Sequence, residues 1–459
     1  PLPDSKDHIL SVNGGIMKPR NRALIQAALL TTAAHAVSGA EILIVDADAA
    51  ARLAVETSTL TAAAADRVEA TQSTVKAADA ARLPALTAAA RYTRHSAVPE
   101  FGVPTDDPTE PVYILFPNIQ NHYRIDLTVE QPVYTGGAIS ASREAARKDE
   151  SAATWSGTLT ALDLAYSARM SYWSAVAAAS GVDVAKAQIK RTQRLLDDAH
   201  ALREAGMAVN ADVYAAEARF SAAEVDLIRT RNEEAQALTR LRSLLGIDGA
   251  TEIALRDART EKVPAAPRPL SDLESDALET RPELRIADAQ IEGLGARARS
   301  VKAARKPTVA ATGQYLLARP NQRFLPPVDE GNDSWLISIA ATWRFFDGSR
   351  TKEQVATAHA EQRALQHDRS ELERQIRLDV ANARLALESA LEAVVATDTS
   401  ANAAQAWEAA SSERYSAGIA MLSELLDAQA DLAAAEMAQV RSRARAWLAD
   451  ATLRRAVGR

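Results

Sequence analysis

The sequence predicts an internally duplicated chain in which four β-strands with one apolar face are joined to two long helical hairpins. Three observations carry this prediction: where the prolines fall, a strict two-residue alternation in four short segments, and a repeat at a constant offset.

The composition is typical of long helices rather than of a thick globular core. Apolar residues make up 47% of the 459 residues, but many are alanine, and aromatic residues are only 5%. Cysteine is absent, which excludes disulfides, thiolate metal sites, cysteine nucleophiles and lipoprotein acylation, and suits a protein of the cell envelope. The net charge of −7, without a long basic run, argues against a nucleic-acid partner.

The N-terminal segment has the pattern of a signal peptide over residues 17–40, and residues 1–16 receive no role. A basic stretch, Met17–Arg22, precedes the apolar stretch Ala23–Ala34, and small residues near Ala36 or Ala40 offer a cleavage site. Export through a Sec-type route is therefore expected, and an amphipathic cytosolic N-terminus is the alternative. No run of eighteen apolar residues follows, so a transmembrane helix is not expected.

The prolines divide the chain because proline inside a helix is costly. All 18 fall in clusters that leave 133–263 and 328–459 free of proline. Both stretches are rich in strong helix formers, and each has a glycine break, at Gly206 and at Gly418. We therefore expect two helical hairpins; Ile139–Arg203 alone would be about 100 Å long at 1.5 Å per residue.

The proline-rich parts show a two-residue period. Residues 123–130 alternate between apolar and polar side chains without an exception. In 335–345, apolar residues recur at every second position and alternate with Ser338, Thr342 and Arg344. Weaker partners are 86–92 and 309–315, and the segments 94–121 and 318–333 read as polar extracellular loops. A soluble β-sandwich is the alternative interpretation of these strands.

The two halves are a duplication. Residues 81–92 match 304–315 at an offset of 223, with five identities in twelve positions. After the loops the offset becomes 212, which aligns Gly136 with Gly348, Gly206 with Gly418, and Asp212 with Glu424. Each half therefore consists of strand, loop, strand, long helix, turn and helix.

Four strands of about ten residues have the length that crosses an outer-membrane-type bilayer, but they cannot close a barrel. A membrane sheet must have no free edge, so other copies must supply strands, and three copies giving twelve form the smallest assembly with a useful lumen. Aromatic residues at the strand ends fit the girdles of such a barrel: Tyr92, Tyr123, Tyr315 and Trp335 near the loops, and Tyr134, Trp343 and Phe345 at the other end.

The resulting division of the chain is as follows. In the first half, residues 41–83 are predicted to be helical, 84–134 to form the first strand pair, and 135–245 to form the first long helical hairpin. Residues 246–282 are predicted to form an equatorial linker. In the second half, residues 283–306 are predicted to be helical, 307–346 to form the second strand pair, and 347–459 to form the second long helical hairpin.

With these features in this order, the chain resembles the TolC-type outer-membrane efflux protein family over residues 41–456. The motifs that carry the resemblance are Gln131-Pro132-Val133-Tyr134, Leu244-Leu245-Gly246, Arg281-Pro282-Glu283-Leu284, Arg414-Tyr415-Ser416-Ala417-Gly418 and Leu425-Leu426-Asp427-Ala428-Gln429. The resemblance implies a homotrimer with a twelve-stranded membrane β-barrel and a twelve-helix α-helical barrel. It also implies a periplasmic adaptor, an inner-membrane pump, outer-membrane lipid around the barrel, and no enzymatic step or cofactor.

The resemblance also assigns site residues. It places Glu424 and Asp427 in an acidic ring at the periplasmic gate; their spacing puts them on one helix face, although acidic residues in a first helical turn are also explained by the helix dipole. It makes Asp212 and Tyr415 candidates for the latch of the gate, where Ala420 departs from the basic residue of some members. The hairpin tips Gly206, Met207, Gly418 and Ile419 are expected to dock the adaptor.

Other glycines and acidic residues have simpler explanations. Gly136, Gly137 and Gly348 are expected at strand-to-helix turns rather than in a phosphate-binding loop. The sequence has no H-E-x-x-H, GxSxG or Walker motif. Asp106, Asp107 and Glu110 could hold a cation, but the favoured interpretation is a solvated acidic loop, which needs no ligand.

Two functions remain open from the sequence. An outer-membrane exit duct of a tripartite efflux or type I secretion system accounts for the strands and the helices together. A soluble periplasmic coiled-coil adaptor or scaffold would also have long helical hairpins, but it needs no strands with aromatic ends. The alternation in 123–130 and 335–345 favours the duct, whose substrate the sequence does not specify.

Overall fold

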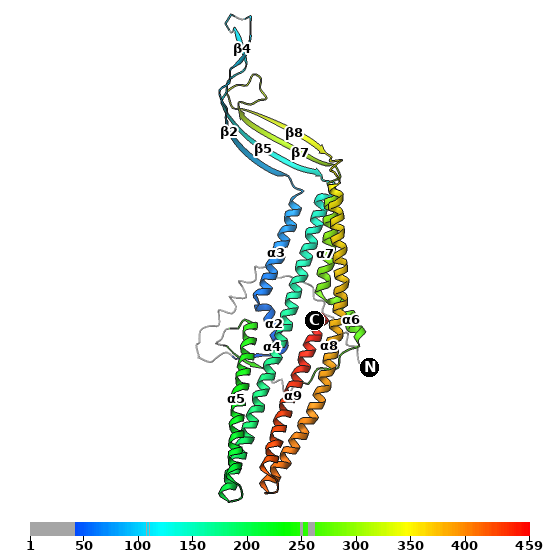
Figure 1. Ribbon diagram of the computed structural model, residues 1–459. Coiled ribbons are helices and arrows are strands. Elements are labelled where there is room, and N and C mark those ends of the chain that lie inside the picture. The colour runs from blue at the N-terminus through cyan, green and yellow to red at the C-terminus, as the bar shows by residue number, and fades with distance from the viewer. Residues whose placement is uncertain (1–41, 107, 110, 248–250, 256–261) are drawn as a thin grey trace, which may run out of the picture.

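The computed structural model describes residues 42–106, 108–109, 111–247, 251–255 and 262–459, which form one elongated protomer (Figure 1). A curved β-sheet lies at one end, long helices run from it, and two helical hairpins form the other end. The predicted signal peptide at 17–40, and Asp107 and Glu110 of the acidic loop, lie outside the described residues.

The sheet has four antiparallel strands in the order β2-β5-β7-β8. Their bounds are β2 Ala85–Arg94, β5 Asn121–Tyr134, β7 Thr308–Arg319 and β8 Asn332–Thr342. Strand β8 ends earlier than expected, because Thr342 pairs with Thr308, where β7 begins, and beyond it there is no neighbouring strand. Trp343 and Phe345, predicted within the strand, therefore follow it; their rings lie 6.3 Å apart at this end of the sheet.

The pairing register collects apolar side chains on one face of this sheet. Leu127 pairs with Ala88 on one side and Tyr315 on the other, and Tyr315 pairs with Trp335. On the opposite face, Asp126 accepts hydrogen bonds from Arg124 and from the Gln314 amide, each at 2.8 Å. The apolar face is exposed, and no other strand of the described residues packs on it, so the β-sandwich interpretation is wrong.

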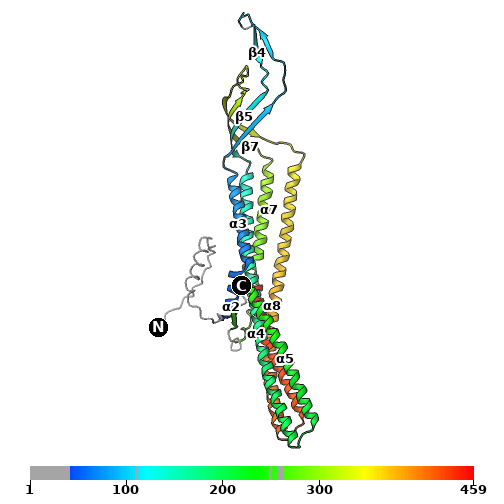
Figure 2. The same ribbon diagram turned by 90° about the vertical axis from the view of Figure 1, so that its left-hand side faces the viewer.

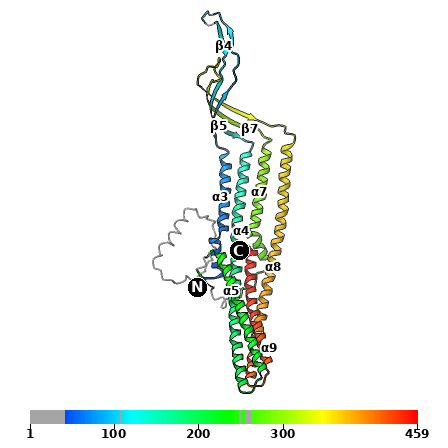
Figure 3. The same cartoon turned by 60° about the vertical axis from the view of Figure 1, so that its left-hand side comes forward.

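Each helical arm contains one helix of 67 residues, about 100 Å long, and a shorter returning helix. These are α4 Ala138–Glu204 with α5 Asn210–Leu245, and α8 Arg350–Ser416 with α9 Leu422–Ala456. Gly157 and Gly181 do not interrupt α4. Beside the sheet end of α4 and α8 lie α3 Thr59–Ala80 and α7 Pro282–Ala303 (Figure 3). None of the described helices has an apolar stretch sufficient to cross a bilayer.

The duplication extends further than the sequence indicates. Two short helices, α2 Ala47–Thr57 and α6 Leu270–Thr280, have bounds that differ by the same 223 residues as those of α3 and α7. The bounds of α4 and α8 differ by 212 residues. Both repeats therefore begin with a short helix that the alignment of the strands did not reach.

The middle of the protomer contains two strands that the sequence analysis missed. Strand β1 Ile42–Val45 begins the segment predicted as helical, and it pairs in parallel with β6 Glu252–Leu255, which lies in the predicted linker. Val45 and Ile253 pack into a buried cluster with Tyr172 and Trp173 of α4. Four-residue strands carry too little periodicity to be recognised against the helix on one side and the linker on the other.

Two pseudo-equivalent hydrogen bonds join the returning helices to this middle region. The Thr57 hydroxyl donates to the Leu245 carbonyl at 2.9 Å, and the Thr280 hydroxyl donates to the Val457 carbonyl at 2.5 Å. Each bond satisfies a carbonyl at a helix C-terminus, which has no partner inside its own helix. The returning helices are thus fixed at the same level in both repeats.

The segment 94–121, predicted as a polar extracellular loop, is not wholly irregular. It contains a hairpin of β3 Phe101–Pro104 and β4 Val112–Phe116, which extends beyond the sheet along the long axis of the protomer (Figure 2).

Candidate functional site

The two hairpin tips are built alike. Gly206 and Gly418 have φ values of +76° and +72°, in the left-handed region that glycine adopts without steric cost. After each glycine, the amide nitrogen of the next residue donates back to the helix that has just ended: Met207 to the Leu202 carbonyl at 2.8 Å, and Ile419 to the Arg414 carbonyl at 2.9 Å. This helix-ending motif turns the chain, and it leaves the Met207 and Ile419 side chains exposed to solvent.

A buried apolar cluster joins the two hairpins just above the tips. Its members come from α4, α5, α8 and α9: Leu195, Ala199, Val213, Ala216, Tyr415, Leu422 and Leu425. Because all four helices contribute, one hairpin cannot move away from the other without exposing this cluster. The cluster is therefore the packing that holds the two hairpins of a protomer together at this end.

Tyr415 is the largest side chain of this cluster and is only 7% exposed. Its hydroxyl is buried, and it has no hydrogen-bond partner among the described residues. Burial, together with the nearby carboxylates of Asp212 and Asp198, raises the pKa of Tyr415 above its ordinary value, so the phenol stays neutral. Tyr415 thus lies in the cluster between the hairpins, and its role in a latch stays a prediction.

Asp212 is placed in the first turn of α5. Its carboxylate accepts a hydrogen bond from the Val209 amide nitrogen at 3.3 Å, which satisfies one of the free N–H groups at the start of the helix. No ion-pair partner of Asp212 exists among the described residues, and its contribution to Tyr415 is electrostatic. Asp212 therefore helps to start the helix and adds negative charge beside the cluster.

Glu424 and Asp427 follow the second tip, but their surroundings differ. Glu424 accepts from the Arg414 guanidinium at 2.5 Å, across the hairpin turn. Asp427, one turn further along α9, is exposed and has no ion-pair partner in the described part of the chain. Of the two predicted gate carboxylates, one is thus neutralised by a neighbouring cation and one is free.

Arg414 is a partner of a predicted site residue that the sequence analysis did not single out. It stands in the motif that identified the second tip, and Glu424 follows it by ten residues. In an antiparallel hairpin with a turn at 417–421, residues at that separation face each other across the helices. The opposite charges of Arg414 and Glu424 at this spacing are the sequence signal that indicates the pair.

A polar groove of about 500 Å³ lies between the two hairpins above the tips. Its α4 side carries Lys190, Arg191 and Arg194, and the opposite side carries Glu408 and Glu413 of α8 and Glu436 of α9. Arg191 and Glu436 form an ion pair at 2.7 Å that bridges the groove. The groove therefore presents charged side chains of both signs, of which Arg191 and Glu436 are paired with each other.

The predicted strand-to-helix turns all have left-handed backbone. Gly136, Gly137 and Gly348 have φ values of +65°, +93° and +64°, and Ser349 takes the place of the second glycine in the second repeat with φ +71°. A side chain at Gly136 would also lie 2.8 Å from Lys306 Cβ, so glycine is required there for space as well as for conformation.

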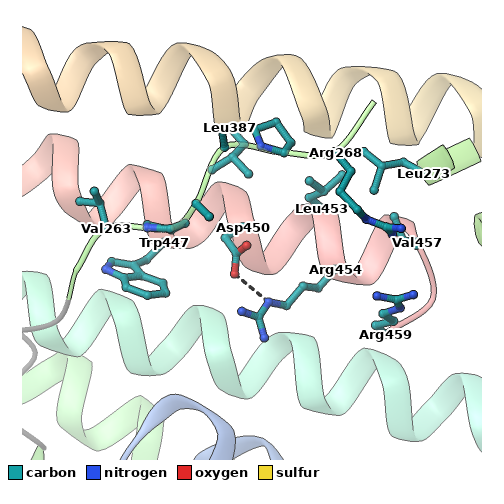
Figure 4. Close-up of a pocket in the computed structure, with 14 residues that line it drawn as sticks. Val263, Arg268, Leu273, Leu387, Trp447, Asp450, Leu453, Arg454, Val457 and Arg459 are labelled. Carbon is teal, nitrogen blue, oxygen red and sulfur yellow. Dashed lines mark hydrogen bonds and ion pairs between the residues drawn. The ribbon is translucent and has the colours of Figure 1, made fainter. Parts of the chain in front are cut away.

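A separate hollow of about 400 Å³ lies at the middle of the protomer (Figure 4). Its wall includes Trp447, which stacks on Trp173 with ring centroids 4.3 Å apart. The three arginines that line it are ion-paired, Arg454 with Asp450 and both Arg268 and Arg459 with Asp276. All three arginines are therefore already engaged in ion pairs within the chain.

The chain is similar in sequence and in fold to known proteins. The chain is 27% identical to Protein CyaE of Bordetella pertussis over 355 residues, which are 71% of this chain and 69% of that protein. It is similar to the crystal structure of a membrane protein from Pseudomonas aeruginosa, with 21% identity, a TM-score of 0.73, and coverage of 93% and 98% of the two chains. It is also similar to the outer membrane protein VceC from Vibrio cholerae, with 19% identity, a TM-score of 0.72, and coverage of 90% and 96%.

These similarities confirm the predicted fold, a membrane β-barrel element joined to an α-helical barrel element. The closure of that barrel by three copies stays a prediction. The family model described as outer membrane efflux protein matches residues 50–247 and 273–459, which include both repeats. The chain therefore belongs to the outer membrane efflux protein family.

Proposed function

We propose that three copies of this chain form an exit duct in the outer membrane, through which an inner-membrane pump expels substrates across the periplasm to the outside. The observation that carries the proposal is the four-stranded sheet with an exposed apolar face and a hydrogen-bonded polar face. This arrangement matches the wall of a water-filled barrel in lipid. A soluble adaptor or scaffold does not need a sheet with an exposed apolar face.

The edges of the sheet support the proposed number of copies. Strands β2 and β8 are its outer strands, and unpaired strand edges are not tolerated in lipid. Strand β2 runs away from the helices and β8 runs back toward them, so β2 of one copy can pair antiparallel with β8 of the next. Two copies would give about eight strands, whose interior side chains fill, whereas three give about twelve and leave a lumen.

The helices continue the duct on the other side of the membrane. Each protomer contributes four helices at the level of α3, α4, α7 and α8, and four at the level of the two hairpins. Three protomers therefore give a ring of twelve helices at either level. Helices about 100 Å long allow this ring to reach far into the periplasm.

We assign the narrow periplasmic entrance of the duct to the hairpin tips around Gly206 and Gly418. Asp427 and Glu424 of three copies would gather six carboxylates around the axis, of which three are paired with Arg414. The remaining charge makes the closed entrance prefer cations and bind multivalent cations. Tyr415 and the apolar cluster around it keep the hairpins together in this closed state.

The periplasmic adaptor is expected to dock at the tips and along the polar groove beside them. Exposed Met207 and Ile419 offer apolar contacts, and the groove between α4 and α8 offers charges of both signs. Transport, rather than catalysis, is the activity proposed for the chain. The class of substrate is set by the pump and adaptor.

Planar-bilayer recordings on the purified protein test this function. The proposal expects a small, cation-preferring conductance that multivalent cations added on the tip side block. Alanine at both Glu424 and Asp427 should abolish the preference and the block. Recovery of the protein only from the soluble periplasmic fraction, with no conductance, would support the adaptor or scaffold instead.

A further inference from the structure

The β3–β4 hairpin is an apolar structure that nothing in its own protomer covers. Its strands pair only with each other among the described strands, and six of its large apolar side chains are 40% to 58% exposed. These side chains are Phe101, Val103, Val112, Tyr113, Ile114 and Phe116. At its base, the Asn118 side chain accepts from the Val98 amide at 3.2 Å, so the hairpin begins in a defined position above the sheet.

The sequence of β4 is that of a strand covered on both faces. Residues 112–116 read Val-Tyr-Ile-Leu-Phe, without the alternation that a half-exposed strand shows. An isolated two-stranded hairpin is only marginally stable in water. A hairpin with this sequence therefore indicates a contact surface that the protomer alone does not supply.

The topology of the sheet identifies what lies beside the hairpin. Strand β2 ends at Arg94, and the hairpin follows it on the side away from the helices. When β2 pairs with β8 of the next copy, the end of β2 lies beside the start of that β8, which is preceded by the β7–β8 loop at 320–331. The hairpin of one copy and the β7–β8 loop of its neighbour thus meet at the same rim of the barrel.

The β7–β8 loop has a matching surface. Asn321 fixes it by donating to the Asn332 carbonyl at 3.0 Å and to the Ser334 hydroxyl at 3.1 Å. Although the loop is held in this way, its apolar side chains remain 41% to 74% exposed: Phe324, Leu325 and Val328. The loop of the same protomer leaves the hairpin uncovered, so the complementary loop is that of the adjacent copy.

We propose that the β3–β4 hairpin of each copy packs on the β7–β8 loop of the adjacent copy, as a clasp outside the bilayer. The inference rests on the three-copy barrel proposed above. The clasp buries both apolar surfaces at once, and it fixes the pairing of β2 with the neighbouring β8. A lipid surface and an extracellular protein are the competing occupants of the hairpin.

Disulfide cross-linking tests the clasp directly, because the chain has no cysteine of its own. Phe116→Cys and Phe324→Cys are introduced together in the full chain, which is purified in mild detergent, oxidised and run on a denaturing gel. We expect covalent dimers and trimers from the double variant and their loss in either single variant. The control pair, Phe116→Cys with Met207→Cys at the opposite end of the protomer, should give none.

The outcomes separate the clasp from the duct. Particles with the mass of three chains but without cross-links would overturn the clasp and leave the duct intact, whereas a monomer in mild detergent would overturn both. Protection of the Phe116→Cys thiol by lipid, without cross-links, would assign the hairpin to a lipid surface and also overturn the clasp.

A stability measurement gives an independent test. Phe116→Ser and Phe324→Ser should each lower the temperature at which the trimer dissociates, and the double variant should lower it no further than the larger single effect. Ile44→Ser, at an exposed position in the middle of the protomer, serves as the control. Fully additive shifts would contradict direct contact between the two side chains.

Discussion

Replacing Arg414 with alanine should make multivalent cations block the duct more tightly. In the structure the Arg414 and Glu424 side chains are 48% and 27% exposed, so the charges act through a medium close to water. Removing three guanidinium groups from the proposed trimer leaves three Glu424 carboxylates uncompensated. A divalent cation about 8 Å from each would gain roughly 1 kcal/mol per carboxylate in water, and screening at 0.1 M salt reduces the total for three to about 1.4 kcal/mol.

That energy corresponds to about a tenfold lower blocking concentration. The assay is titration of the cation in planar-bilayer recordings of wild type, Arg414→Ala, Glu424→Ala and the double variant. Block should be tightest for Arg414→Ala, alike for wild type and the double variant, and weakest for Glu424→Ala, whose arginine is left alone. Arg374→Ala removes an exposed, ion-paired arginine of α8 far from the tip and should change nothing.

Unchanged block in Arg414→Ala would refute this reasoning, because it would show that the pair lies off the conduction path. Equal loss of block in all three variants would instead indicate a structural change at the tip. Arg414→Lys separates these cases, since it keeps the charge and should behave like wild type.

Three further predictions concern single positions. Tyr415→Phe should leave the free energy of unfolding unchanged or raise it by about 1 kcal/mol, because the hydroxyl that it removes is buried without a hydrogen-bond partner among the described residues. A clearly lower melting temperature would mean that another copy in the trimer supplies a partner for this hydroxyl. Gly418→Trp should abolish export in a transport assay while the trimer persists. Gly418→Ala, which carries the same backbone strain without the bulk, should retain export. Loss of export in both variants would point to backbone strain instead of a docking role. The Asp347 carboxylate accepts hydrogen bonds from the hydroxyl and from the backbone amide of Thr351, and these bonds lower the pKa of Asp347. The resulting stabilisation is present above about pH 4 and is lost as the pH falls through the lowered pKa. Thr351→Val should therefore make the melting temperature depend less on pH in this range.

The long elements were predictable because their signals are repeated many times. Helices of 67 residues contain many turns of helix-forming residues bounded by glycine, and strands that face lipid on one side must alternate. The duplication added a second copy of each signal. Fold class and the positions of the tips therefore followed from the residues alone.

The short elements were not predictable because their signals are too short to be repeated. Strands β1 and β6 have four residues each, and their pairing joins segments about 210 residues apart in the chain, which no local pattern reports. The β3–β4 hairpin was hidden by proline, aspartate and glycine around it, although the apolar run at 112–116 was visible.

The site was predicted in part. The resemblance supplied the places of Glu424, Asp427, Asp212 and Tyr415, but not their partners. The pairing of Arg414 with Glu424 depends on how α8 and α9 lie across the turn, which is a property of tertiary packing. The missing hydrogen-bond partner of Tyr415 likewise follows from the cluster around it and not from its neighbours in sequence.

The mass of the protein in mild detergent tests the central claim most directly, because the duct exists only if β2 of each copy is closed by β8 of the next. Native mass spectrometry, which separates bound detergent from protein, should give the mass of three chains as the single species. A monodisperse monomer that still inserts into bilayers would contradict the account.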